Sequence, residues 1–186
     1  NSIGSLLTLT DVSAAFAGGG VDNAEGAATI TNQSPITIAS DSISAGAVTI
    51  TTTDDADFPM LDDDLTVNAG IIVQSTTSSV TLNAGDDAAI GAGALISAPL
   101  GVVTINVDAG NTDPGAGAVL LIDSTADIDA ASAVFNGAGD NDTFTFRPDD
   151  DATSNFPASP LMNTPITVNG FAPATFPGDV LNLDIG

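Results

Sequence analysis

The sequence predicts an all-β protein built as a parallel β-helix (β-solenoid), and three observations lead to this fold class. Short runs of alternating apolar and polar residues, rich in Val, Ile and Thr, recur along the 186 residues. Gly, Asp, Asn and Pro separate most of these runs. Related segments return at intervals typical of repeat architectures. Residues that normally fill helix surfaces, namely Lys, Arg, Gln and Glu, are nearly missing.

The expected strands follow one another closely, and β-branched residues fill most of them. In chain order they are 6–9, 28–31, 36–38, 47–51, 65–67, 71–73, 79–82, 102–107, 119–122, 143–146, 166–168 and 180–183.

The middle of the chain repeats an apolar strand, a small-residue turn, a second strand and an Asp/Gly corner. Ile43, Val73, Ile96 and Ile128 anchor the successive units and lie 30, 23 and 32 residues apart. Stacked units of this kind share one narrow aliphatic core. An antiparallel β-sandwich or jelly roll is the alternative fold, because the same short strands can also pair as hairpins.

The C-terminal part differs in composition from the rest. We expect residues 1–146 to form the solenoid-like body. Residues 147–186 are rich in Pro and Phe, and we expect them to form a capping or linking segment of the same structural unit. Pro interrupts strand ladders, and large Phe side chains can close an open end that would otherwise expose unpaired backbone groups.

The charge balance is extreme, with 24 acidic residues, one basic residue and a net charge of −23. Glu25 is the only glutamate and Arg147 the only basic residue, so nearly all the acidity is aspartate. Aspartate suits turns and oxygen-ligand sites for Ca²⁺. Such a charge repels itself unless cations or salt offset it. We therefore expect Ca²⁺ as the cofactor and a secreted, extracellular or cell-surface location. A halophilic origin is a further alternative, but it would enrich glutamate too.

Composition also argues against several function classes. The chain has no His, Cys, Trp or Tyr, which removes imidazole bases, thiol nucleophiles and Cys/His zinc sites. We expect no enzymatic activity. Nucleic acid is a poor partner because its phosphates need Lys and Arg. No apolar run is long enough to span a bilayer, so we expect no membrane insertion.

Clusters of aspartates in the expected turns are the candidate metal sites. Ca²⁺ takes six to eight oxygen ligands from carboxylates, carbonyls and water, and adjacent carboxylates repel one another without a cation. For each cluster, a solvated acidic turn without a specific site is the alternative. The candidate ligands are Asp140, Asn141, Asp142, Asp62, Asp63, Asp64, Asp54, Asp55, Asp86 and Asp87.

Three segments, 140–146, 164–170 and 177–183, resemble parts of giant secreted bacterial surface proteins of the β-strand-repeat and haemolysin-type calcium-binding kind. The run 137–144 approximates the calcium motif G-G-x-G-x-D of that family. It lacks the paired glycine and the tandem copies, so it is compatible with a single site rather than a stacked roll. The resemblance implies export, adhesion or scaffolding and bound Ca²⁺, without catalysis.

Together these observations predict a non-catalytic structural module of an extracellular fibre, sheath or adhesin, stabilised and cross-linked by Ca²⁺. The expected partners are copies of itself or neighbouring modules. One alternative is a Ca²⁺-dependent module that binds a glycan or a protein. Another is a filament subunit joined by strand donation, in which residues 5–10 add to a neighbour's sheet edge. The same segment can instead be the first strand of its own domain.

Overall fold

The computed structural model describes residues 7–10, 21–33, 35–54, 63–110, 117–146, 165–171 and 178–183. These residues form strands joined by turns and bends, and none of them belongs to a helix that is long and apolar enough to cross a membrane. The strands are β1 (Leu7–Thr10), β2 (Asp22–Asn23), β3 (Ala28–Asn32), β4 (Ile36–Ile38), β5 (Ser42–Ser44), β6 (Val48–Thr52), β7 (Leu65–Val67), β8 (Ile72–Ser75), β9 (Val80–Asn83), β10 (Ala88–Ile90), β11 (Leu95–Asn106), β12 (Val119–Ile122), β13 (Asp127–Asn136), β14 (Thr143–Phe146), β15 (Ile166–Asn169) and β16 (Val180–Leu183).

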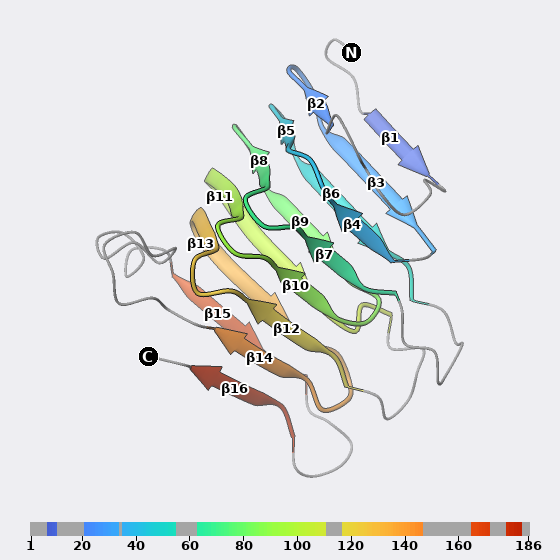
Figure 1. Ribbon diagram of the computed structural model, residues 1–186, viewed down its shortest axis with the longest axis vertical. Coiled ribbons are helices and arrows are strands. Elements are labelled where there is room, and N and C mark those ends of the chain that lie inside the picture. Colours follow the sequence, from blue (N-terminus) through green and yellow to red (C-terminus); the bar gives the residue numbers. More distant parts are fainter. Residues whose placement is uncertain are drawn as a thin grey trace.

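These strands form two sheets, and every pairing among them is parallel. The ten-stranded sheet has the order β1-β3-β6-β9-β11-β8-β5-β2, with β13 joined to β11 and β15 joined to β13. The six-stranded sheet has the order β16-β14-β12-β10-β7-β4. Figure 1 shows the chain advancing from β1 and β2 (blue) at one end to β15 and β16 (red) at the other.

The chain returns to each sheet again and again, and we call each return a pass. Neighbouring strands in a sheet come from successive passes. The strand β3 pairs with β6, β6 with β9 and β9 with β11, while β4, β7, β10 and β12 pair in the second sheet over the same passes. A strand therefore rarely pairs with its neighbour in sequence. As a result, residues at equivalent places in successive passes lie side by side, about 4.8 Å apart.

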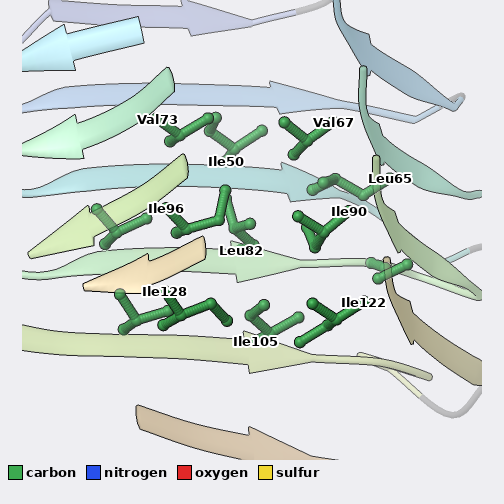
Figure 2. Packing of buried hydrophobic residues seen from close by; sticks show 14 of the residues in the cluster. Ile50, Leu65, Val67, Val73, Leu82, Ile90, Ile96, Ile105, Ile122 and Ile128 are labelled. Atoms are coloured by element: carbon green, nitrogen blue, oxygen red, sulfur yellow. The ribbon is translucent and has the colours of Figure 1, made fainter. Parts of the chain in front are cut away.

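The core lies between the sheets and is filled by one residue in two along most of the described strands. In β3 and β6 the buried positions alternate with half-exposed ones, as the period of a strand requires. The register aligns Ile50, Leu82, Ile105 and Phe135 in one column, and each is fully buried. Figure 2 shows Ile50, Leu82 and Ile105 of this column among the other aliphatic side chains of the interior. Burying each one contributes about 1.5–3 kcal/mol.

The fold class predicted from the sequence is wrong in two respects. A regular β-helix of equivalent units requires a turn between the first and second strands of every unit. Instead, β11 and β13 run through that position, with a register shift between Ala98 and Val102. They merge two faces into one ten-stranded sheet beside the six-stranded one (Figure 1). The small residues at this point allow a bulged strand to bend where a turn was expected.

The second error concerns the C-terminal cap. The described part of the Pro/Phe-rich segment does not close the end of the molecule. Its strands β15 and β16 extend the two sheets by pairing with β13 and β14. The antiparallel sandwich is also wrong, because all described pairings are parallel. A division of the chain after residue 146 remains a prediction.

Strands β2 and β10 were not expected from the sequence, and β5 and β13 were expected only as parts of the repeat units anchored by Ile43 and Ile128. Their composition is atypical: β5 buries Ser42 and Ser44, and β13 carries Asp127 and Asp129. The repeat register holds for Val73, Ile96 and Ile128, which pair in one row, but Ser42 rather than Ile43 aligns with Val73. Pairing with adjacent passes supplies the strand conformation that local propensity does not.

Candidate functional site

Several aspartates lie just after the C-terminal ends of strands in the ten-stranded sheet. Because β6, β9, β11 and β13 are parallel and adjacent, the segments that follow them meet at one edge. We call this the aspartate corner, and it contains Asp54, Asp86, Asp108, Asp140 and Asp142. Burial is deep at this edge, where Asp54, Asp108 and Asp142 are each at most 9% exposed.

Asp86 and Asp87 connect adjacent passes of the chain through backbone amides. The Asp63 amide donates to Asp86 Oδ2 at 2.9 Å, and the Asp86 amide donates to the Asp63 carbonyl at 3.2 Å. The Asp87 amide donates to Asp64 Oδ1 at 3.2 Å, and the Val119 amide donates to Asp87 Oδ1 at 2.7 Å. Burial raises the pKa of Asp87, the Val119 amide opposes that rise, and the Asp86 charge adds to it.

Asp142 binds amides on two sides. Its Oδ1 accepts from the Ala118 amide at 2.9 Å, and its Oδ2 accepts from the Ala138 amide at 2.8 Å. Its own amide donates to Asp179 Oδ1 at 3.0 Å. Asn141 repeats the pattern, since its Oδ1 accepts from the Gly178 amide at 3.1 Å. These residues join three passes of the chain, and burial of Asp142 raises its pKa.

Most of the predicted ligands thus have a structural use in this fold. The buried amides at a corner need acceptors, and a short carboxylate supplies them across the gap between passes. This geometry favours the turn-forming interpretation for Asp63, Asp64, Asp86, Asp87 and Asp142. Asp55 and Asp62, also predicted as ligands, lie outside the described residues.

Asp108 differs from the other aspartates at the corner. Its side chain is 4% exposed, and its Oδ2 is buried without a hydrogen-bond partner. Its backbone has a φ of 52°, in the left-handed region that non-glycine residues seldom adopt. Burial, followed by the charges of Asp142, Asp140, Asp54 and Asp86, raises the pKa of Asp108 to about 7. The sequence did not single out this residue.

Glycines allow the corner to pack closely. A Cβ at Gly85 would lie 2.7 Å from Asp63 Cβ and 2.8 Å from the Asp54 amide nitrogen. A Cβ at Gly110 would lie 2.8 Å from Asp54 Oδ2. The buried Thr52 hydroxyl donates to the Asp63 carbonyl at 2.5 Å and accepts from the Gly85 amide at 2.7 Å. The Asp/Gly pattern read from the sequence therefore marks a tightly packed edge.

The described aspartates do not form a ready-made metal site. Within the described ranges, no group of three or more acidic side chains is placed so that it could hold a metal ion as it stands. Asp140, Asn141 and Asp142 are consecutive, but Asp142 and Asn141 direct their oxygens at separate amides. Asp54 and Asp86 lie close enough to Asp108 to raise its pKa.

A hollow of about 600 Å³ opens beside Asp108. Two corner segments line it, Asn106–Gly110 and Asn136–Gly139, together with the exposed ring of Phe171. The oxygen atoms of these segments are backbone carbonyls, the Asp108 carboxylate and the amide oxygens of Asn106 and Asn136, and both amide oxygens already accept side-chain hydrogen bonds. The hollow therefore offers the ligand types that a hard cation prefers.

Sequence reasoning missed a ladder of asparagines on the outer face of the same strands. Asn106 Nδ2 donates to Asn83 Oδ1 at 2.5 Å, and Asn136 Nδ2 donates to Asn106 Oδ1 at 2.6 Å. Asn169 Nδ2 donates to Asn136 Oδ1 at 2.8 Å, and Asn83 Nδ2 donates to Thr51 Oγ1 at 2.9 Å. The signal was an Asn that ends each of these strands in sequence.

Comparison with protein-family models, with curated proteins and with solved structures finds no match to this chain.

Proposed function

We propose that this chain is a non-catalytic structural module of an extracellular fibre, sheath or adhesin, with Ca²⁺ as a stabilising ion. The observation that carries the proposal is the stack of parallel strands with unpaired edges at both ends of its described part. Strands β1, β2 and β4 end the sheets on one side, and β15 and β16 end them on the other.

The two ends present different surfaces, which favours head-to-tail contact. A heterologous contact that does not close on itself gives an open filament, and an unpaired strand edge is a ready template for another chain. The C-terminal edge is also apolar, since Ile166, Val180 and Leu181 are each more than 40% exposed. Copies of the chain or neighbouring modules are therefore the proposed partners.

The net negative charge of the chain supports the calcium ion and the extracellular location in this proposal. A net charge of −23 opposes the approach of one copy to another, and a divalent cation reduces that repulsion. Extracellular modules bind Ca²⁺ with dissociation constants of about 10⁻⁴–10⁻³ M, so an extracellular setting would keep such a module loaded. The resemblance to secreted calcium-binding surface proteins supports the same setting.

The experiment that tests assembly blocks one edge. The Val180 amide donates to the backbone carbonyl of Asp142 in the adjacent pass. The next amide, that of Leu181, therefore points the other way, toward the open edge of β16. Leu181→Pro removes this donor, and Leu181→Ala keeps it. With CaCl₂ present, sedimentation velocity and electron microscopy should show filaments or oligomers for the parent chain and Leu181→Ala, and fewer for Leu181→Pro. A parent chain that stays monomeric in CaCl₂ contradicts the proposal.

A second function is favoured by the outer face of the ten-stranded sheet. Its half-exposed residues include two uncharged rows, with Thr29, Thr49, Thr81 and Thr104 in one row and the asparagine ladder beside it. Hydroxyls and amides on a regular surface suit the hydroxyls of a neutral glycan. Retention of a monomer on a polysaccharide column, lost on Thr81→Lys, would favour the glycan-binding alternative over assembly.

A further inference from the structure

Several carboxylates of the aspartate corner accept hydrogen bonds from backbone amides, but the buried Oδ2 of Asp108 accepts none. Asp86 Oδ2 and both oxygens of Asp142 accept amide hydrogen bonds. Asp108 Oδ2 is buried and has no partner in the protein, and the residue is 4% exposed. A buried polar atom without a partner loses its hydration without compensation.

The surroundings make this position more unfavourable for a negative charge. Asp54, Asp86, Asp140 and Asp142 all act electrostatically on Asp108. The one basic side chain of the sequence, Arg147, lies outside the described residues. A carboxylate in such a place needs either a proton or a bound cation. The backbone of Asp108 also lies in the left-handed region, a kind of strain that clusters at ligand sites.

We propose that Asp108 is the principal ligand of a divalent-cation site, with Ca²⁺ the preferred ion, in the hollow between segments Asn106–Gly110 and Asn136–Gly139. The remaining ligands are carbonyl oxygens of these two corners and water, with the neighbouring carboxylates supplying negative potential. The site is centred on Asp108, one pass before the segment 137–144 that resembles a calcium motif, and it shares only the corner residues 137–139 with that segment.

The number of charged ligands sets the affinity for Ca²⁺ that we expect of this site. Calcium affinity rises with the number of charged ligands and with rigidity. Within the described residues no group of three acidic side chains is placed to hold an ion, so one carboxylate with carbonyls and water gives a weak site. We expect a dissociation constant of about 10⁻⁴–10⁻³ M, the range of extracellular modules. This inference gives the calcium part of the proposed function a location and rests on that function.

The test compares calcium responses at constant ionic strength. A ligand that binds only the folded state raises the melting temperature, so the parent chain should melt higher as CaCl₂ replaces NaCl. Asp108→Asn should lose most of this rise, since Asn tolerates the left-handed backbone but lacks the charge. Asp41→Asn is the matched control. Asp41 accepts the Ile72 amide at 2.9 Å on an exposed edge, so its loss should leave the calcium response intact.

Each outcome decides the question. An unchanged calcium response in Asp108→Asn overturns the site while leaving a calcium-bound module intact. The absence of any response in the parent chain overturns calcium binding altogether, whereas filament formation by the same sample would still support assembly. If Asp108→Asn does not fold, Asp108→Gly replaces it, because glycine adopts a φ of 52° without strain. Equilibrium dialysis of the parent chain against ⁴⁵Ca²⁺ gives the binding constant directly.

Discussion

An aspartate oxygen lies only two bonds beyond Cβ, and at the corners of this molecule that length matches the gap between passes. Asp87 reaches the Val119 amide and Asp142 reaches the Ala118 amide without leaving the turn. A glutamate places its carboxylate one carbon farther from the backbone. The near absence of glutamate thus has a local physical cause, since an acceptor on a short side chain satisfies the buried amides of tight corners.

The raised pKa of Asp127, which lies outside the aspartate corner, should make the stability of the fold depend on pH. Burial, and then the charge of Asp129, raises the pKa of Asp127 to about 6, against a weaker opposing effect of the Ile128 amide. Its Oδ1 is buried without a partner. Because the folded pKa is above the unfolded value of 3.8, the folded state holds the proton longer. The stability that depends on Asp127 is therefore fully present below pH 3.8 and is lost as pH rises from there through about 6.

Thermal melts of Asp127→Asn in EDTA measure this effect. The variant should match the parent chain only below pH 3.8, the unfolded pKa, and should melt higher at pH 7, where the folded parent carries a charge whose pKa is raised by burial. Asp129→Asn should lower the pKa of Asp127, because a deprotonated Asp127 is then less repelled, so the fall in stability should be smaller and end at lower pH. Equal melting of Asp127→Asn and the parent at pH 7 would contradict the prediction.

Gly101 predicts a steric effect at the bulge of β11. A Cβ at this position would overlap the backbone carbonyl of Ser78 in the preceding pass, and that backbone cannot move aside. Gly101→Ala should lower the free energy of unfolding by about 1–3 kcal/mol, as overpacking does. Urea denaturation followed by circular dichroism measures it. The neighbouring Leu100 is 74% exposed, and Leu100→Ala should change stability by less than about 0.5 kcal/mol.

Among the elements, the outer face of the ten-stranded sheet depends on side chains that repeat at the same register. The asparagine ladder joins β9, β11, β13 and β15 through amide hydrogen bonds parallel to those of the backbone. Such ladders stabilise stacked parallel strands. They also oppose a one-residue slip, which would move every asparagine to the core side.

Asn106 is an interior member of the ladder and tests its contribution. It donates one side-chain hydrogen bond and accepts another. Asn106→Ala should lower the free energy of unfolding by about 1–3 kcal/mol, since each net hydrogen bond is worth about 0.5–1.5 kcal/mol. Asn182 makes one exposed side-chain bond of 3.4 Å to Thr145 on the other sheet, so Asn182→Ala should cost clearly less. Equal losses in the two variants would show that the ladder adds nothing beyond a single exposed bond.

At the scale of the whole molecule, a parallel stack concentrates its charge along one edge. Equivalent residues of successive passes are neighbours, so one aspartate per pass becomes a column of aspartates. Burial is the largest cause of the raised pKa values of Asp87, Asp108 and Asp142, and neighbouring carboxylates add to each rise.

Screening should therefore stabilise the fold even without calcium. Raising NaCl from about 0.01 M to about 1 M shortens the Debye length from about 30 Å to about 3 Å. In EDTA, the melting temperature of the parent chain should rise over this range, mainly at its lower end. Calorimetry at fixed pH measures the rise, and glycerol at matched osmolality controls for general solvent effects. A melting temperature that does not change with NaCl would contradict a charge-limited stability.

The sequence by itself determined that this protein is made of β-strands, because alternation and β-branched residues are local properties. It also placed the Asp/Gly corners at the ends of strands, and it aligned Val73 with Ile96 and Ile128. It did not determine that β11 and β13 pass through an expected turn, because a bulged strand and a turn use the same small residues. Only the tertiary structure decided which aspartates serve amides and that Asp108 has an unpartnered oxygen. The physical reason is that partners and burial depend on which passes become neighbours, and that is set by pairing between residues more than 20 positions apart.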